Sequence, residues 1–211
     1  MTEPANSTSD WAEFHRRSLV RPPRELLRRT LGCFALEKRE PGLAVDLGCG
    51  AGPESLELLR CGWQVHAYDA NEGGLKTLFD STPSAFRSSL HTHTKSFWEV
   101  DFPPCDFLWA GYSLPFCPSE DLSTLWAKII TALRPNGRFA GDFFGDQHAW
   151  AAEAGITTQT EAEVRGMLEG LIVEAFDVEN GVRPSGDVLT RWHAFGIAAR
   201  KIEESAGARD A

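Results

Sequence analysis

The sequence predicts an α/β protein with a doubly wound sheet: seven mostly parallel strands, helices on both faces, and an antiparallel hairpin at the C-terminal end. Short apolar runs alternate with segments of helical periodicity, which is typical of parallel strands joined by crossover helices. The last two apolar runs have only a glycine- and proline-containing turn between them, which indicates a hairpin. A glycine-rich turn follows the first run, where sheets of this kind bind ligands.

The first predicted elements are a helix and a buried strand. Pro22 and Pro23 open the helix, whose apolar residues recur at helical spacing as far as Phe34. Leu43–Leu47 is a short apolar run and is predicted to be the first strand. A second helix over 54–60 follows the glycine turn. Each helix should pack on the sheet through its apolar face.

Two further strands and a weaker helix are expected next. The second strand is predicted over 63–68, because Gly62 ends the preceding helix. The segment 71–79 carries two glycines, which weaken a helix but leave its leucines on one side. A polar third strand over 90–94 is expected at an edge of the sheet, and a mostly apolar fourth strand is expected over 106–110.

The clearest helix covers 119–133, with Ser119 as its expected N-cap. The sequence LRPNG then breaks the helical pattern, and a strand is predicted over 137–145. Thr160 and Glu163 have the spacing of a capping box and therefore predict the start of another helix.

The hairpin is expected from strands near 172–178 and 189–200. The polar segments 1–10 and 203–211 are expected to be flexible tails. One domain over 11–202 is therefore predicted, a length that suits a single hydrophobic core.

The composition argues against several classes of partner. A net charge of −9 and a pI near 5.2 disfavour binding to phosphate backbones or anionic membranes. No apolar stretch approaches the roughly 20 residues of a membrane span, and the first residues lack the layout of a secretion signal. The five cysteines lack the close pairs of zinc or redox motifs. We expect a cytoplasmic protein with free thiols, no bound metal, and no nucleic-acid or membrane partner; the oligomeric state stays open.

The glycine turn, VDLGCGAG, is the strongest functional signal. Gly48, Gly50 and Gly52 remove side chains where the chain must turn sharply and approach a ligand closely. Their spacing is G-x-G-x-G, whereas a dinucleotide-binding turn has G-x-G-x-x-G. Pro53 follows Gly52, so the third glycine of the dinucleotide pattern is misplaced, which disfavours NAD as the ligand.

Two acidic residues refine this interpretation. Asp46 precedes the turn, where a carboxylate repels a pyrophosphate but attracts the ammonium and sulfonium of S-adenosylmethionine. Asp69 ends the second strand, where its two oxygens can accept hydrogen bonds from a ribose diol. Asp46 therefore favours adenosylmethionine. Asp69 indicates a nucleoside, which is present in both NAD and adenosylmethionine.

Four motifs in this order, VDLGCGAG, VHAYDAN, DFLWAGYSLPF and LRPNGRFAG, resemble the class I S-adenosylmethionine-dependent methyltransferases. The resemblance covers most of residues 11–200 and implies a Rossmann-like fold with adenosylmethionine as cofactor. Within that superfamily, the stretches WAEFHRR, YSLPFCP and RWHAFGIAAR are similar to small bacterial methyltransferases of the tellurite-resistance type.

The resemblance also implies roles for individual residues. The three turn glycines would flank the methionine and ribose portions, and Asp69 would bind the ribose hydroxyls. Gly111 and Tyr112 would meet the methionine end. Ser96 stands where the family often has an acid that binds adenine. The remaining residues expected around adenine are Ala70, Phe97 and Trp98.

The methyl acceptor is expected beside an N-terminal lid within 11–40. Trp11 and Arg16 are predicted to contact the cofactor, and Arg16 would bind the carboxylate of the cofactor. His15 is a candidate base. His15 and Tyr112 are the predicted catalytic residues. The predicted acceptor-binding residues are Phe14, Phe116, Phe144 and Trp150, whose rings suit a flat or partly apolar molecule.

Other histidines and acids receive weaker expectations. Asp146 and His148 follow the fifth strand and are alternative bases. His91 and His93 share a strand face, but without a third ligand no metal site is expected.

Three functions are compatible with these patterns. The leading hypothesis is an adenosylmethionine-dependent methyltransferase that acts on an oxygen, nitrogen, sulfur or other chalcogen atom of a small molecule. The alternatives are an NAD(P)-dependent oxidoreductase and a non-catalytic protein that binds adenosylmethionine.

Overall fold

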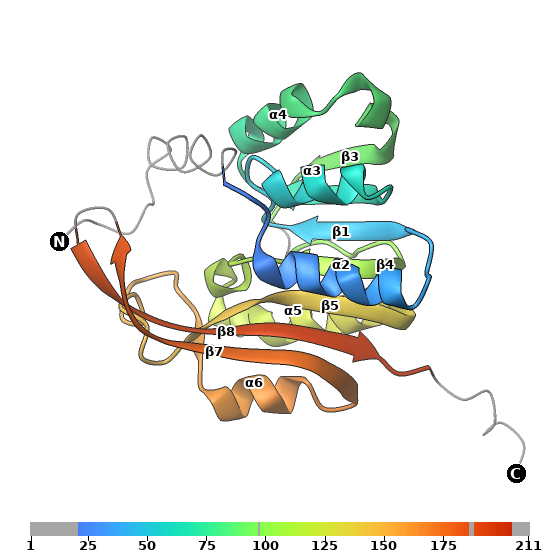
Figure 1. Ribbon diagram of the computed structural model, residues 1–211. Helices are drawn as coiled ribbons and strands as arrows, with labels where there is room; N and C mark the ends of the chain where they lie inside the picture. Colours follow the sequence, from blue (N-terminus) through green and yellow to red (C-terminus); the bar gives the residue numbers. More distant parts are fainter. Residues whose placement is uncertain (1–20, 97, 186–187, 204–211) are drawn as a thin grey trace, which may run out of the picture.

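A computed structural model describes residues 21–96, 98–185 and 188–203, and a mixed β-sheet forms its centre (Figure 1). Along the sheet the strands are β3 (Leu90–Thr94), β2 (Gln64–Asp69), β1 (Leu43–Leu47), β4 (Cys105–Ala110), β5 (Leu133–Gly145), β8 (Val188–Lys201) and β7 (Leu171–Ser185). The strands from β3 to β5 are parallel, and β8 is antiparallel to both of its neighbours. A two-residue strand, β6 (Thr158–Gln159), pairs with β5 outside this path. The predicted α/β fold is confirmed.

Helices cover both faces of the sheet (Figure 1). On one face lie α2 (Glu25–Leu36), α3 (Pro53–Arg60) and α4 (Glu72–Ser81), whose apolar residues share a core with Ala44, Phe107 and Trp109. On the other face lie α5 (Ser119–Ala132) and α6 (Glu161–Met167), packed against Leu108, Phe139 and Phe195. Two short 3-10 helices, η1 (Ser84–Ser89) and η2 (Leu114–Phe116), connect these layers.

Capping residues fix where the helices begin. The predicted capping box of α6 is present, with Thr160 and Glu163 each bonded to the other's backbone. The expectation for α5 is wrong by one residue, because Pro118 is the N-cap and Ser119 is already helical. Pro118 has the extended conformation that an N-cap requires, and its carbonyl accepts bonds from the amides of Asp121 and Leu122.

The C-terminal hairpin is longer than the sequence predicts. β7 and β8 pair along their full lengths, from Leu171 with Lys201 to Ser185 with Val188. The residues that the sequence predicts to form the turn therefore continue the ladder of backbone hydrogen bonds. Proline is tolerated here because β7 is an edge strand and has no neighbour on its other side that would need the missing N–H donor. The pairing of β5 with β8 ends at Phe144 with Ala194. The tip of the hairpin consequently extends past the carboxyl end of β5 (Figure 1).

Strand β5 also begins earlier than predicted. Leu133 pairs with Cys105, but the next pair is Arg138 with Phe107, so the residues between form a bulge in which Asn136 has a φ of 61°.

In the described part of the chain, no helix is both long and apolar enough to cross a membrane.

Candidate active site

The glycine turn adopts a conformation that favours glycine at all three positions. Gly48, Gly50 and Gly52 have φ values of 66°, 54° and 74°, in the left-handed region that side chains rarely adopt. The amides of Gly48 and Cys49 both donate to the carbonyl of Tyr68 at the end of β2. The turn is therefore fixed between the carboxyl ends of β1 and β2, with its last glycine as the N-cap of α3.

Asp69 lies at the end of β2 with its carboxylate held in place by the backbone. Its Oδ2 accepts a hydrogen bond from the amide of Gly50 at 2.7 Å, and its Oδ1 accepts one from the amide of Asn71 at 2.8 Å. Each carboxylate oxygen can accept a second hydrogen bond. Asp69 is thus oriented beside the glycine turn and retains acceptor capacity for a ligand.

Asp46 lies beneath the turn and is 2% exposed. The hydroxyl of Ser55 donates to its Oδ2 at 2.5 Å. Burial raises the pKa of the Asp46 carboxyl to about 7, and the nearby Glu54 and Asp69 act in the same direction, while the bond from Ser55 opposes them. A positive charge brought close to this site would favour the ionised form.

An ion-pair cluster that sequence patterns did not reveal lies beside the turn. Glu54, in the first turn of α3, is 5% exposed and accepts two hydrogen bonds from Arg21, at 2.5 and 2.9 Å. Arg24 lies 4.0 Å from the same carboxylate and stacks over Tyr112, with its guanidinium carbon 4.2 Å from the ring centroid. These contacts connect the segment before α2 to the glycine turn and to the end of β4.

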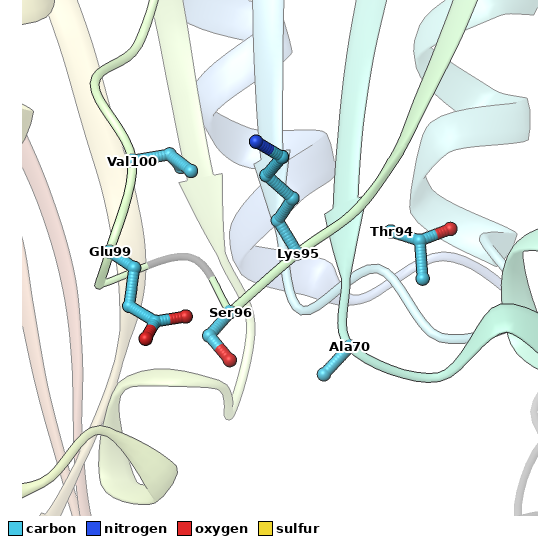
Figure 2. A pocket seen from close by; sticks show the side chains of 6 residues that line it. All are labelled: Ala70, Thr94, Lys95, Ser96, Glu99 and Val100. Atoms are coloured by element: carbon cyan, nitrogen blue, oxygen red, sulfur yellow. The ribbon is translucent and has the colours of Figure 1, made fainter.

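A cavity of about 470 Å³ lies past the ends of β2 and β3 (Figure 2). It is lined by Ala70, Thr94, Lys95, Ser96, Glu99 and Val100. Figure 2 shows the side chains of Ser96 and Glu99 directed toward the same space, whereas Lys95 extends the other way. Ala70 and Ser96, which are expected near the adenine, thus line one cavity, and Glu99 supplies an acid three residues after Ser96.

Two other expected adenine contacts have different outcomes. Trp98 packs against the apolar core on the α5 side and is not among the residues that line this cavity. Its carbonyl accepts a bond from Lys128. Phe97 lies outside the described residues.

Aromatic side chains gather past the ends of β4 and β5. Tyr112 has a φ of 54°, which turns the chain sharply after the strand. Its ring lies 6.0 Å from that of Phe144 and 5.6 Å from that of Trp192. A Cβ on Gly111 would lie 2.5 Å from the Trp109 ring, so the residue before Tyr112 has no room for a side chain. The predicted residues Tyr112, Phe116, Phe144 and Trp150 all belong to this aromatic cluster.

His148 lies inside the aromatic cluster as a neutral imidazole. Its ring stacks on Phe144 with centroids 3.8 Å apart, and it is 3% exposed. Burial, with the positive charge of Arg183 nearby, lowers the pKa of His148 to about 4. Its Nδ1 accepts from the amide of Trp150 at 3.1 Å, so the proton is on Nε2. His148 can therefore donate a hydrogen bond at neutral pH but is a poor base.

Tyr112 is likewise suited to donate rather than to remove a proton. Burial raises the pKa of its phenol, and Asp142 adds to this effect. Arg183 donates a hydrogen bond to the phenol oxygen. The phenol therefore keeps its proton at neutral pH.

Five buried side-chain polar atoms in the described residues have no hydrogen-bond partner: Ser113 Oγ, Asp142 Oδ2, His148 Nε2, Arg183 Nε and Trp192 Nε1. All five lie at one end of the sheet, after β4, in or after β5, or near the hairpin tip. Leaving one such group unpaired costs about 1 to 3 kcal/mol. Unpaired polar atoms concentrated in one place are typical of a site that binds a ligand.

The remaining sequence-predicted site residues fall into two groups. Trp11, Phe14, His15 and Arg16 precede the first described residue. Asp146 is exposed, and its Oδ1 lies 3.4 Å from Nδ1 of His193. Within the described residues, no group of three histidine, cysteine, aspartate or glutamate side chains could hold a metal ion.

The strand order and the turn after β1 agree with the resemblance of the sequence motifs to class I S-adenosylmethionine-dependent methyltransferases, and a family model matches part of the chain. The family whose model matches is described as a methyltransferase domain, and the match covers residues 44–137. None of the curated proteins matches the sequence.

Solved structures show the same fold at low sequence identity. TehB from Haemophilus influenzae is 17% identical with a TM-score of 0.68; the match covers 82% of this chain and 61% of TehB, so the chain spans less than two thirds of that relative. A SAM-dependent methyltransferase from Methanosarcina mazei is 18% identical, with a TM-score of 0.66 over 87% of this chain and 100% of that one. The N-methyltransferase NodS from Bradyrhizobium japonicum, in complex with S-adenosyl-L-homocysteine, is 16% identical, with a TM-score of 0.67 over 92% and 99%.

Proposed function

We propose that this enzyme transfers a methyl group from S-adenosylmethionine to a small molecule, with the cofactor lying across the glycine turn. The observation that carries the proposal is the Asp69 carboxylate, which is fixed by Gly50 and Asn71 and keeps acceptor capacity for a ribose diol. The adenine would enter the cavity beside Ala70 and Ser96, where Glu99 can accept a hydrogen bond from its amino group. Three glycines without side chains leave room for the methionine portion to approach the backbone.

The methionine end would lie between the turn and Tyr112. Asp46 provides a buried negative charge beneath the turn, which favours the ammonium and sulfonium of the cofactor. Arg24, over the Tyr112 ring, is placed to attract the carboxylate. We also propose that residues 11–202 form the methyltransferase domain and that the stretch before Arg21 acts as a lid.

The chemistry requires mainly alignment. S-adenosylmethionine supplies an activated methyl group on a sulfonium. The protein has to place the acceptor in line with the methyl–sulfur bond and exclude water. The aromatic cluster around Phe144 can exclude water, and the donors Tyr112 and His148 Nε2 can orient a polar acceptor.

A small-molecule acceptor agrees with the net charge of the chain and with the name of a protein of similar structure. A net charge of −9 disfavours a nucleic acid. The name of NodS describes an N-methyltransferase, which acts on nitrogen. The five cysteines form no disulfide, which fits the reducing conditions of the cytoplasm, the proposed location.

Isothermal titration calorimetry with S-adenosylmethionine and S-adenosylhomocysteine tests the cofactor assignment. Wild-type protein should bind both, and Asp69→Ala should weaken binding by about 1 to 3 kcal/mol, the value of a lost hydrogen bond to a charged group. Asp80→Asn is a suitable control, because Asp80 is exposed on α4 and pairs only with Lys76 among the described residues. Unchanged affinity in Asp69→Ala would refute its ribose role.

The two alternatives give different results. An oxidoreductase would change the fluorescence of NADH on mixing, and the displaced third glycine predicts no change. If the protein is not catalytic, it would bind adenosylmethionine but release no adenosylhomocysteine with any acceptor.

A further inference from the structure

A second cavity, a groove of about 310 Å³, lies beside the start of α2 on the face that carries α3 and α4. Its floor is formed by Ala194 and Gly196 of β8, where a single methyl group and the absence of a side chain leave room above the sheet. Tyr112 and Arg24 form its wall toward the glycine turn. The groove therefore borders the residue that is expected to meet the methionine end of the cofactor.

Four carboxylates line this groove, and three of them are already paired with arginine. The pairs are Glu25 with Arg28, Asp177 with Arg29, and Glu179 with Arg183.

Asp142 of β5 is the fourth carboxylate and differs from the others. It is 6% exposed, and its Oδ2 is buried without a hydrogen-bond partner. The amide of Tyr112 donates to the carboxylate. Arg24 attracts it at longer range, but among the described residues no cation forms an ion pair with it. The groove thus presents one buried carboxylate with an unsatisfied oxygen.

We propose that Asp142 holds the ammonium group of a primary or secondary amine in this groove and accepts its proton, so that the methyl acceptor is an amine. The inference rests on the methyl-transfer function proposed above. An N–H donor with positive charge is the group that a buried carboxylate oxygen without a partner accommodates best.

The proposed step balances without a further reagent. The ammonium transfers one proton to the Asp142 carboxylate and becomes a neutral amine with a free electron pair. That pair forms a bond to the methyl carbon as the carbon–sulfur bond breaks, and the electrons of the broken bond remain on sulfur. The products are a methylated ammonium, adenosylhomocysteine and protonated Asp142, which releases its proton to solvent.

Other acceptor classes fit this groove less well. A carboxylate or thiolate would be repelled by Asp142 and by the acidic lining, in which Asp177 and Glu179 are also present. An alcohol would form one neutral hydrogen bond and would leave a proton that a carboxylate removes poorly. The faces of Tyr112 and Trp192 are less suited to a second cation, because Arg24 already covers the Tyr112 ring and Arg183 covers the Trp192 ring.

Matched probes test the class of acceptor. The probes are 2-phenylethylamine and hexylamine, compared with 2-phenylethanol and hexanol, and they are titrated by calorimetry into protein saturated with adenosylhomocysteine. We expect the amines to bind at least about tenfold more tightly than the alcohols, as for a charge-assisted bond. Equal binding of amines and alcohols would overturn the proposal.

Variants then assign the preference to Asp142. Asp142→Asn keeps the shape of the side chain and should remove the preference for amines, lower adenosylhomocysteine release with these amines about 100-fold, and leave adenosylhomocysteine affinity unchanged. Ala194→Leu, which fills the floor of the groove, should also block the amines. Asp80→Asn on α4 is the control and should behave as wild type. An amine preference that survives in both groove variants would overturn the proposal.

The outcomes separate this inference from the proposed function. If wild-type protein binds neither adenosylmethionine nor adenosylhomocysteine, the methyl-transfer function itself fails. If both bind but amines are not preferred, only the amine assignment fails. If Asp142→Asn weakens adenosylhomocysteine binding as much as amine binding, the carboxylate serves the cofactor's ammonium and the inference is refuted.

Discussion

Gly52 shows how strictly one residue of the turn is determined. Its φ is 74°, and a Cβ at this position would lie 2.4 Å from a methyl carbon of Leu78. Gly52→Ala should therefore destabilise the protein by about 1 to 3 kcal/mol, because it adds both backbone strain and a clash. Urea denaturation followed by circular dichroism measures this change.

Gly166→Ala is the matched control for that experiment. Gly166 lies within α6, and a Cβ there would meet nothing within 4 Å. Alanine should raise stability by about 0.5 to 1 kcal/mol, since glycine is the weaker helix former. Equal effects of the two substitutions would contradict the argument from conformation.

Asp46 makes stability depend on pH in a defined direction. Burial raises the pKa of this carboxyl from 3.8 to about 7 in the folded protein. Between these values the folded state binds more protons than the unfolded state, so stability falls as pH rises, and the deficit is complete above about pH 7. Asp46→Asn removes the titrating group and keeps an oxygen that can accept from Ser55.

The variant should therefore gain stability over wild type at pH 8 and not at pH 4. The expected gain is about 2 to 4 kcal/mol, from about 1.4 kcal/mol per pKa unit. Denaturant unfolding without ligand at both pH values measures it, and Asp80→Asn controls for the loss of one acidic charge. A gain of equal size at pH 4 would show that the effect does not come from titration.

At the scale of elements, Arg138 connects β5 to α2 and β7. Its side chain is 1% exposed and bonds to Glu37 at the end of α2 and to Glu174 of β7. Arg138→Met should destabilise the protein by about 2 to 4 kcal/mol. This loss is somewhat smaller than the loss on removing one partner of a fully buried ion pair, because Glu37 is partly exposed. Thermal and urea unfolding measure the loss.

The control for Arg138 is an exposed pair of the same type. Arg28 bonds to Glu25 one turn away on the surface of α2. Arg28→Met should change stability by less than about 0.5 kcal/mol. A comparable loss in both variants would mean that burial does not set the value of these ion pairs.

Element patterns in the sequence predicted most of the sheet and the helices, because alternation of apolar runs and helical periodicity are local signals. The hairpin length was missed, since the pairing of Pro184 with Leu189 depends on β7 being an edge strand. The N-cap of α5 was missed because the conformation of Pro118 determines where the helix begins.

At the scale of the whole molecule, the cofactor turn was predictable and the acceptor groove was not. Gly48, Gly50 and Asp69 lie within one strand–turn–helix–strand unit, so their spacing alone identifies the turn. Asp142, by contrast, meets Arg24 and Tyr112 only because β5 lies next to β4 and α2 packs against β5 and β8. Contacts between distant segments leave no spacing pattern in the sequence.

The two ends of the described chain lie at opposite ends of the central strands, which gives the last prediction. Arg21 is held by Glu54 at the start of α3, beside the glycine turn. Lys201 ends β8 at the opposite end of the strands, where its ammonium donates to the carbonyl of Leu133 at the start of β5. Residues 1–20 therefore join the described structure next to the proposed cofactor site, and residues 204–211 join it far from that site.

Deleting residues 1–20 should weaken adenosylhomocysteine binding by about tenfold or more, about 1.4 kcal/mol, if the segment contributes a lid over the cofactor. The melting temperature without ligand is measured alongside, so that a loss of affinity is distinguished from a loss of stability. Deleting residues 204–211 is the matched control and should alter neither quantity. Calorimetry and thermal unfolding of both truncations give the result. An N-terminal truncation that keeps full affinity would exclude the lid and, with it, Trp11 and Arg16 as cofactor contacts.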